Sequence, residues 1–89
     1  MIIIKREIEE GLSEDNKKAL KEVATSFENT PMTILISKEI VGRGQLGVDI
    51  QGYVLIATYG TMIIKKEVAE EVDGIIKVLV SLKQDYMYI

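Results

Sequence analysis

The first third of the chain shows a strand pattern followed by a helix pattern. Residues 2–8 open with three isoleucines and then alternate between polar and apolar, which predicts a β-strand. After a turn, Ser13 is a favourable N-cap, and Glu14 and Asp15 place negative charge at a helix N-terminus. The apolar residues that follow form one stripe at helical spacing: Leu20, Val23, Ala24 and Phe27. We therefore expect an amphipathic helix that ends before Pro31, which cannot continue it.

The middle of the chain consists of apolar runs separated by glycines. Residues 32–41 are apolar and rich in β-branched side chains, and they predict a second strand. Residues 48–58 are apolar without a diagnostic period, so they fit either a strand or a buried helix. Gly60 interrupts the run, and residues 61–66 predict a further strand.

The last long element has the pattern of an amphipathic helix. One face is apolar: Val68, Val72, Ile75, Leu79 and Leu82. The opposite face is polar: Glu70, Asp73, Lys77 and Ser81. Gly74 inside the helix costs about 1 kcal/mol relative to alanine, which indicates close packing at this position. Residues 85–89 form a short tail or a final edge strand.

The order of these elements predicts the class of fold. The 89 residues make one domain with a single core, residues 1–89. The order β-α-β, an ambiguous middle and then β-α fits an α+β fold, with a four-stranded antiparallel sheet covered by helices on one face. If the middle segment is a strand continuous with the second one, a ferredoxin-like βαββαβ arrangement fits as well.

Composition and charge narrow the classes of partner. With 47% hydrophobic and 28% charged residues, the chain is globular. The net charge is −3 and the basic residues are scattered, which argues against nucleic-acid binding. The first ten residues lack the apolar core of a signal peptide. Residues 53–64, the most apolar run, are shorter than the about 20 residues of a membrane span. We expect a cytoplasmic protein with neither a nucleic acid nor a membrane as partner.

The residue types present also limit the chemistry. The chain has no cysteine and no histidine, so it lacks thiolate nucleophiles, the commonest metal ligand and the usual general base. A group of acidic residues is interpreted as a solvated helix face: Glu67, Glu70, Glu71 and Asp73. We therefore expect no catalytic residues, no metal site, no cofactor and no enzymatic activity.

A glycine-rich segment, Gly42-Arg43-Gly44-Gln45-Leu46-Gly47, matches the G-x-G-x-x-G spacing of dinucleotide-binding loops. Glu67 even lies at the distance expected of the acidic residue that binds the ribose. However, the strand-like residues after the segment do not form a capped amphipathic helix, and the chain is smaller than a dinucleotide-binding domain. We interpret the segment as a flexible turn that uses glycine for positive φ.

The same segment is nevertheless the best candidate for binding, because loops carry function disproportionately. Arg43 and Gln45 are polar and predicted to be exposed. An anionic nucleotide held by Arg43 and the loop amides is the alternative to a protein contact there.

Several short matches, read in order, resemble the histidine-containing phosphocarrier family, HPr. They are IIIKREI, then Gly11-Leu12-Ser13, a helix ending at Phe27, Met32-Thr33-Ile34-Leu35, and LIATYGT before MIIKK. That family is an open-faced sandwich of about this length, with a four-stranded antiparallel sheet under three helices. The resemblance implies the same scaffold, with the glycine-rich loop beside a surface that the family uses for partner contact.

The chain departs from that family at the residues that perform its chemistry. Ser13 stands at the position of the phosphoryl-accepting histidine, and Asp15 and Asn16 replace the arginine and proline that follow it. Relay of a phosphoryl group through histidine is excluded in a chain without histidine. The resemblance therefore implies a member that has kept the scaffold as a docking surface.

These patterns predict a non-enzymatic interaction protein that binds a protein partner or itself. Tyrosines favour interfaces, and residues 86–89 would form a homo-oligomer if they added a strand to a neighbour's sheet. The alternative is a small-ligand sensor for an anionic nucleotide. The predicted contact residues are Ser13, Gly42, Arg43, Gly44, Gln45 and Gly47.

Overall fold

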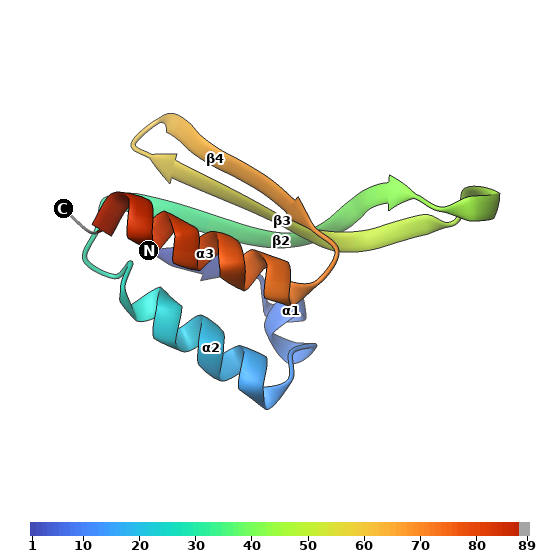
Figure 1. Ribbon diagram of the computed structural model, residues 1–89, viewed down its shortest axis with the longest axis horizontal. Coiled ribbons are helices and arrows are strands. Elements are labelled where there is room, and N and C mark those ends of the chain that lie inside the picture. Colours follow the sequence, from blue (N-terminus) through green and yellow to red (C-terminus); the bar gives the residue numbers. More distant parts are fainter. Residues whose placement is uncertain (88–89) are drawn as a thin grey trace.

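The computed structural model describes residues 1–87 as one layer of helices packed on one sheet (Figure 1). In chain order the elements are β1 (Ile2–Ile4), α1 (Arg6–Glu10), α2 (Glu14–Thr25), β2 (Met32–Arg43), the 3-10 turn η1 (Gln45–Gly47), β3 (Asp49–Tyr59), β4 (Met62–Ala69) and α3 (Val72–Met87).

The sheet has four strands in the order β1-β2-β3-β4, with α2 and α3 on the same side of it (Figure 1). This confirms the predicted α+β class with helices on one face. The sheet is mixed, however, because β1 runs parallel to β2 while the other neighbours are antiparallel. The parallel pair follows from α1 and α2, which form the crossover that a parallel connection requires. The alternative βαββαβ order does not occur, since β2, β3 and β4 follow one another without an α-helix.

Both ends of the described chain differ from the local pattern. The strand expected over residues 2–8 ends at Ile4, and Arg6–Glu10 form the helix α1 instead. In this helix Ile8 is buried in the core, and an Arg6–Glu10 ion pair spans one turn at 3.2 Å. Residues 85–87 belong to α3 and do not form an edge strand, and the remainder of that predicted tail, residues 88–89, lies outside the described residues.

The ambiguous residues 48–58 are strand rather than helix. β3 pairs with β2 along its whole length, with Leu35 opposite Ile56 and Ile36 opposite Leu55. The pairing supplies the hydrogen bonds that a buried apolar segment needs, so tertiary context settles what periodicity leaves open.

The core lies between the helices and the sheet. The predicted stripes of both long helices supply most of its helical side: Leu20, Ile75, Leu79 and Leu82. Phe27, which was expected on the first of these helices, is also buried but lies in the turn after α2, which ends at Thr25. The sheet contributes Ile34, Ile36, Leu55 and Ala57. Close packing at Gly74 is confirmed, because a Cβ atom there would lie 2.8 Å from the Cβ of Ala69. Val68, which the helix pattern included, belongs to β4 and is exposed.

The hairpin formed by β2 and β3 extends well beyond the body of the molecule (Figure 1). The pairing of β3 with β4 begins at Tyr53, so residues 40–51 pair only with one another. We call residues 40–51 the arm. The register shifts between Ile40 and Gly42, and the extra residue, Val41, forms a bulge that increases the local twist. The molecule is elongated as a result, with extents of 47 × 30 × 20 Å.

Candidate functional site

The tip of the arm is a tight turn held by its own backbone. The amide of Gly44 donates to the carbonyl of Val48 at 2.7 Å, and the amide of Val48 donates to the carbonyl of Gln45 at 3.4 Å. Leu46 and Gly47 both have positive φ, 62° and 73°. Glycine adopts this conformation freely, so the expectation of a turn built on positive φ is confirmed at Gly47.

Leu46 is the unusual residue of the tip. It is fully exposed (101%) and is the only non-glycine residue with positive φ among the described residues. A leucine in the left-handed region costs roughly 1–2 kcal/mol, because its Cβ approaches the following carbonyl oxygen. An exposed side chain in a strained backbone contributes nothing to the core. Local strain of this kind is concentrated at functional sites.

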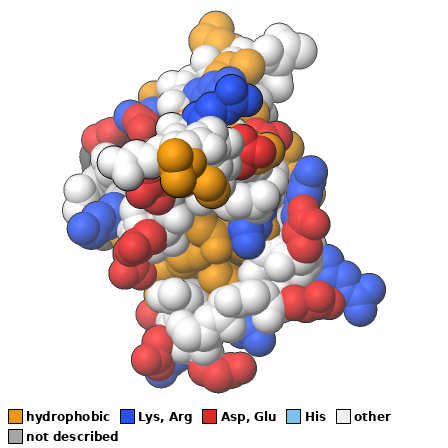
Figure 2. All heavy atoms as spheres, turned by 90° about the vertical axis from the view of Figure 1, so that its right-hand side faces the viewer, with side chains coloured by type: hydrophobic (Ala, Val, Ile, Leu, Met, Phe, Trp, Pro, Cys, Tyr) orange, Lys and Arg blue, Asp and Glu red, His pale blue; other side chains and the backbone are white. Residues whose placement is uncertain are grey.

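Other apolar side chains accompany Leu46 on the arm. Val48 and Ile40 are both exposed. Figure 2 faces this end of the molecule and shows hydrophobic side chains standing among basic and acidic ones. The arm therefore presents exposed apolar side chains beside its charged ones.

The charges at the tip balance each other. Arg43 and Asp49 lie opposite one another in the register, with Nε and Oδ1 4.0 Å apart, and both side chains are largely exposed. An ion pair in this setting contributes between 0 and about 1 kcal/mol. The guanidinium and the carboxylate thus remain accessible to a partner, but the site carries no net positive charge.

The phosphate-binding alternative has little support from this geometry. The glycine-rich segment leads into β3 through a single 3-10 turn, and within residues 1–87 no α-helix begins at it. The amides of Gly44 and Val48 are committed within the turn, and Arg43 is shared with Asp49. The tip therefore lacks the positive potential that an α-helix N-terminus offers to a phosphate.

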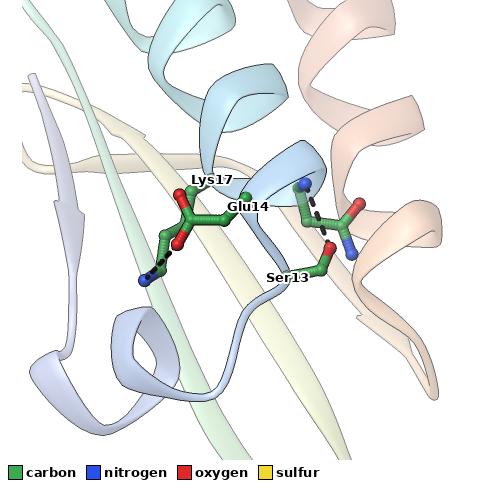
Figure 3. Close-up of polar contacts among 4 residues, drawn as sticks. Ser13, Glu14 and Lys17 are labelled. Carbon is green, nitrogen blue, oxygen red and sulfur yellow. Dashed lines mark hydrogen bonds and ion pairs between the residues drawn. The ribbon is translucent and has the colours of Figure 1, made fainter.

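Ser13 lies apart from the other predicted contact residues. It caps α2, whose Asn16 amide donates to the Ser13 Oγ at 3.2 Å, and Glu14 pairs with Lys17 at 3.5 Å (Figure 3). The start of α2 is in the helical layer, well separated from the tip in Figure 1. The structure brings together the glycine-rich segment, including Gly42, and gives Ser13 a structural role.

A cavity of about 470 Å³, which sequence patterns did not reveal, lies at the end of the body opposite the arm. It is lined by Thr30, Pro31, Met32, Tyr59, Met62, Ile64 and Tyr86. Met32, Tyr59 and Met62 adjoin because they are register partners across three strands. The interfacial character of tyrosine was a signal for Tyr59 and Tyr86, but only the strand register shows that they share a cavity.

Within residues 1–87, no group of three or more acidic side chains is placed to hold a metal ion. In the same part of the chain, no helix combines the length and the apolar character needed to cross a membrane. Comparison with known proteins adds no relative, since no protein-family model, curated protein or solved structure matches this chain.

Proposed function

We propose that this protein is a non-enzymatic interaction protein, acting in the cytoplasm, whose arm binds a partner protein. The observation that carries the proposal is Leu46, a strained and fully exposed leucine at the end of a projecting, backbone-paired hairpin. Folding gains nothing from this side chain. Binding does, because burying a leucine side chain in a partner stabilises a complex by about 1.5–3 kcal/mol.

The backbone pairing of the hairpin holds Leu46 at a defined position before a partner binds. Each strand of the arm is paired with the other up to Arg43 and Asp49, and the tip is closed by backbone hydrogen bonds. A preorganised contact loses less conformational entropy on binding than a flexible loop does. We expect the partner to offer an apolar pocket for Leu46, with polar groups at its rim that match Arg43 and Asp49.

Site-specific photo-cross-linking tests the proposal. A photoreactive phenylalanine derivative replaces Gln45 at the tip, and in a control chain it replaces Lys18, an exposed residue of α2. In extract from the cells that make the protein, we expect a discrete adduct from position 45 and none from position 18.

The mass of the adduct identifies what the arm binds. An adduct whose mass is not a multiple of that of the 10.0 kDa chain supports a different protein as partner. An adduct of two copies would show that the arm binds a second copy of this chain and not a different protein. Equal labelling from both positions, or no adduct from position 45, would overturn the proposed role of the arm.

A further inference from the structure

The face of the sheet that points away from the helices carries an apolar patch that neither long helix covers. We call it the open face. The register places Ile3, Leu35 and Ile56 in one row across three strands, and the row ends at Lys66 on β4. Ile63 and Val68 lie on the same face, opposite Thr58 and Val54 in the register. In Figure 1 the long helices α2 and α3 cover only the other side of the sheet.

The centres of β2 and β3 have the pattern of a sheet covered on both faces. A sheet with one solvated face normally alternates apolar and polar residues, whereas strands buried on both faces are apolar throughout. Here Ile34-Leu35-Ile36 in β2 and Val54-Leu55-Ile56-Ala57 in β3 are continuous apolar runs. On the open face this leaves large apolar side chains in water, including Ile63 at 62% exposure. Exposed apolar patches of this kind mark interaction sites.

Two charges on the open face, Lys66 and Glu39, are complementary between two copies. Along the paired rows between Thr33 and Glu39, the strands place Lys66 and Glu39 on this face. Lys5, two residues after Ile3 in extended backbone, adds a second cation beside β1. Two strands of about 4.8 Å and four residues of about 3.3 Å separate Lys66 and Glu39, or roughly 16 Å. They therefore do not neutralise each other within one chain. A two-fold axis in the plane of the interface, midway between them, brings each Lys66 to the Glu39 of a second copy.

We infer that the open face binds a second copy of this chain and forms a two-fold dimer by sheet-on-sheet packing. Six residues in each of β2, β3 and β4 and the three of β1, at about 4.8 Å by about 3.3 Å each, give a flat area of roughly 330 Å² per copy. The pair thus buries about 650 Å² of flat area, which side-chain relief raises toward the about 1,000 Å² that a specific interface needs. An area at this lower limit gives a dimer of moderate affinity, and the face has too little charge to select a strongly charged partner.

Sedimentation equilibrium of the full chain tests the dimer, with a matched pair of substitutions. Ile63→Lys places a charge on the open face, and Ile40→Lys makes the same change on the arm, at a similar exposure of 58%. Both side chains are exposed, so both variants retain the fold, which circular dichroism verifies. We expect the wild type and Ile40→Lys to dimerise by about 100 μM, and the Kd of Ile63→Lys to rise at least about tenfold.

A monomeric wild type at that concentration would overturn the inference, as would an equal loss of dimer in both variants. Charge exchange then tests the two-fold arrangement. Lys66→Glu and Glu39→Lys should each weaken self-association, because each places like charges across the interface. A mixture of the two variants should restore the dimer as a heterodimer, because opposite charges then face each other at both contacts. Failure of the mixture to recover would refute the Lys66–Glu39 contact and with it the proposed symmetry.

Discussion

Replacing Leu46 by glycine should stabilise the fold while removing the residue that the arm presents. No buried area is lost, because the leucine is fully exposed in the free protein. Glycine relieves roughly 1–2 kcal/mol of left-handed strain at φ 62°. The greater freedom of glycine in the unfolded chain returns about 0.4–1 kcal/mol of that gain. The net effect is a rise of about 0.5–1 kcal/mol in the free energy of unfolding, or roughly 4 °C in Tm for a domain of this size.

Urea and thermal denaturation of the wild type, Leu46→Gly and Leu46→Ala measure this effect. The alanine variant is the control, since it removes the apolar side chain but keeps a Cβ in the left-handed region. Its stability should stay within about 0.5 kcal/mol of the wild type. A loss of more than 1 kcal/mol in Leu46→Gly would refute the reasoning, because it would show that Leu46 makes stabilising contacts within its own chain.

Four further predictions concern the body and the tip. Leu79→Ala should lower the free energy of unfolding by about 2–5 kcal/mol, because Leu79 is 0% exposed; a loss below 1 kcal/mol in urea denaturation would contradict its place in the core. Gly52→Ala should cost about 1–3 kcal/mol, since the new Cβ would lie 2.7 Å from the Ala69 carbonyl oxygen, and an unchanged Tm would argue against that contact. Ser13→Ala should cost about 1 kcal/mol through loss of the helix cap, and Ser13→Asp should recover it; equal stability of all three chains would remove the capping role. A panel of nucleotides should leave Tm unchanged, whereas a rise that Arg43→Ala abolishes would revive the alternative of nucleotide binding at the tip.

Local sequence signals were sufficient for the elements whose determinants lie within a few residues. Ser13 followed by Glu14 and Asp15 predicted the start of α2, and the structure shows the cap. The apolar stripes of the two long helices predicted their core faces for the same reason, because a 3.6-residue period is legible along the chain. Gly74 was recognised as a position of close packing from its cost in a helix alone.

Features set by pairing between distant segments were not predictable in the same way. The direction of β1 relative to β2 depends on the path of the connecting helices, so the expected antiparallel sheet is mixed. This parallel pair departs from the sheet that the resemblance to HPr implies, and that resemblance stays a prediction. The cavity near Tyr59 and Tyr86 likewise depends on strand register, which no local pattern encodes.

The candidate site combines features that the local sequence predicts with features that depend on strand pairing. The glycines of residues 42–47 predicted a turn, and the structure places that turn at the end of the arm. The projection of the arm follows from β4, which pairs with β3 only as far as Tyr53 and leaves the rest of the hairpin outside the body. No sequence signal marks Leu46, because a single leucine within a glycine-rich segment has no hydrophobic periodicity. Its exposure and its φ value identify it.

The yield of the adduct from a photoreactive residue at position 45, compared between Leu46→Gly and Leu46→Met, tests the role of the arm most directly. Both variants keep the hairpin, and only methionine keeps an apolar side chain of similar volume at the tip. We predict that the adduct persists in Leu46→Met and falls at least about tenfold in Leu46→Gly, as expected when about 1.4 kcal/mol or more of binding free energy is lost. Equal yields from the two variants would show that Leu46 is not the residue through which the arm binds its partner.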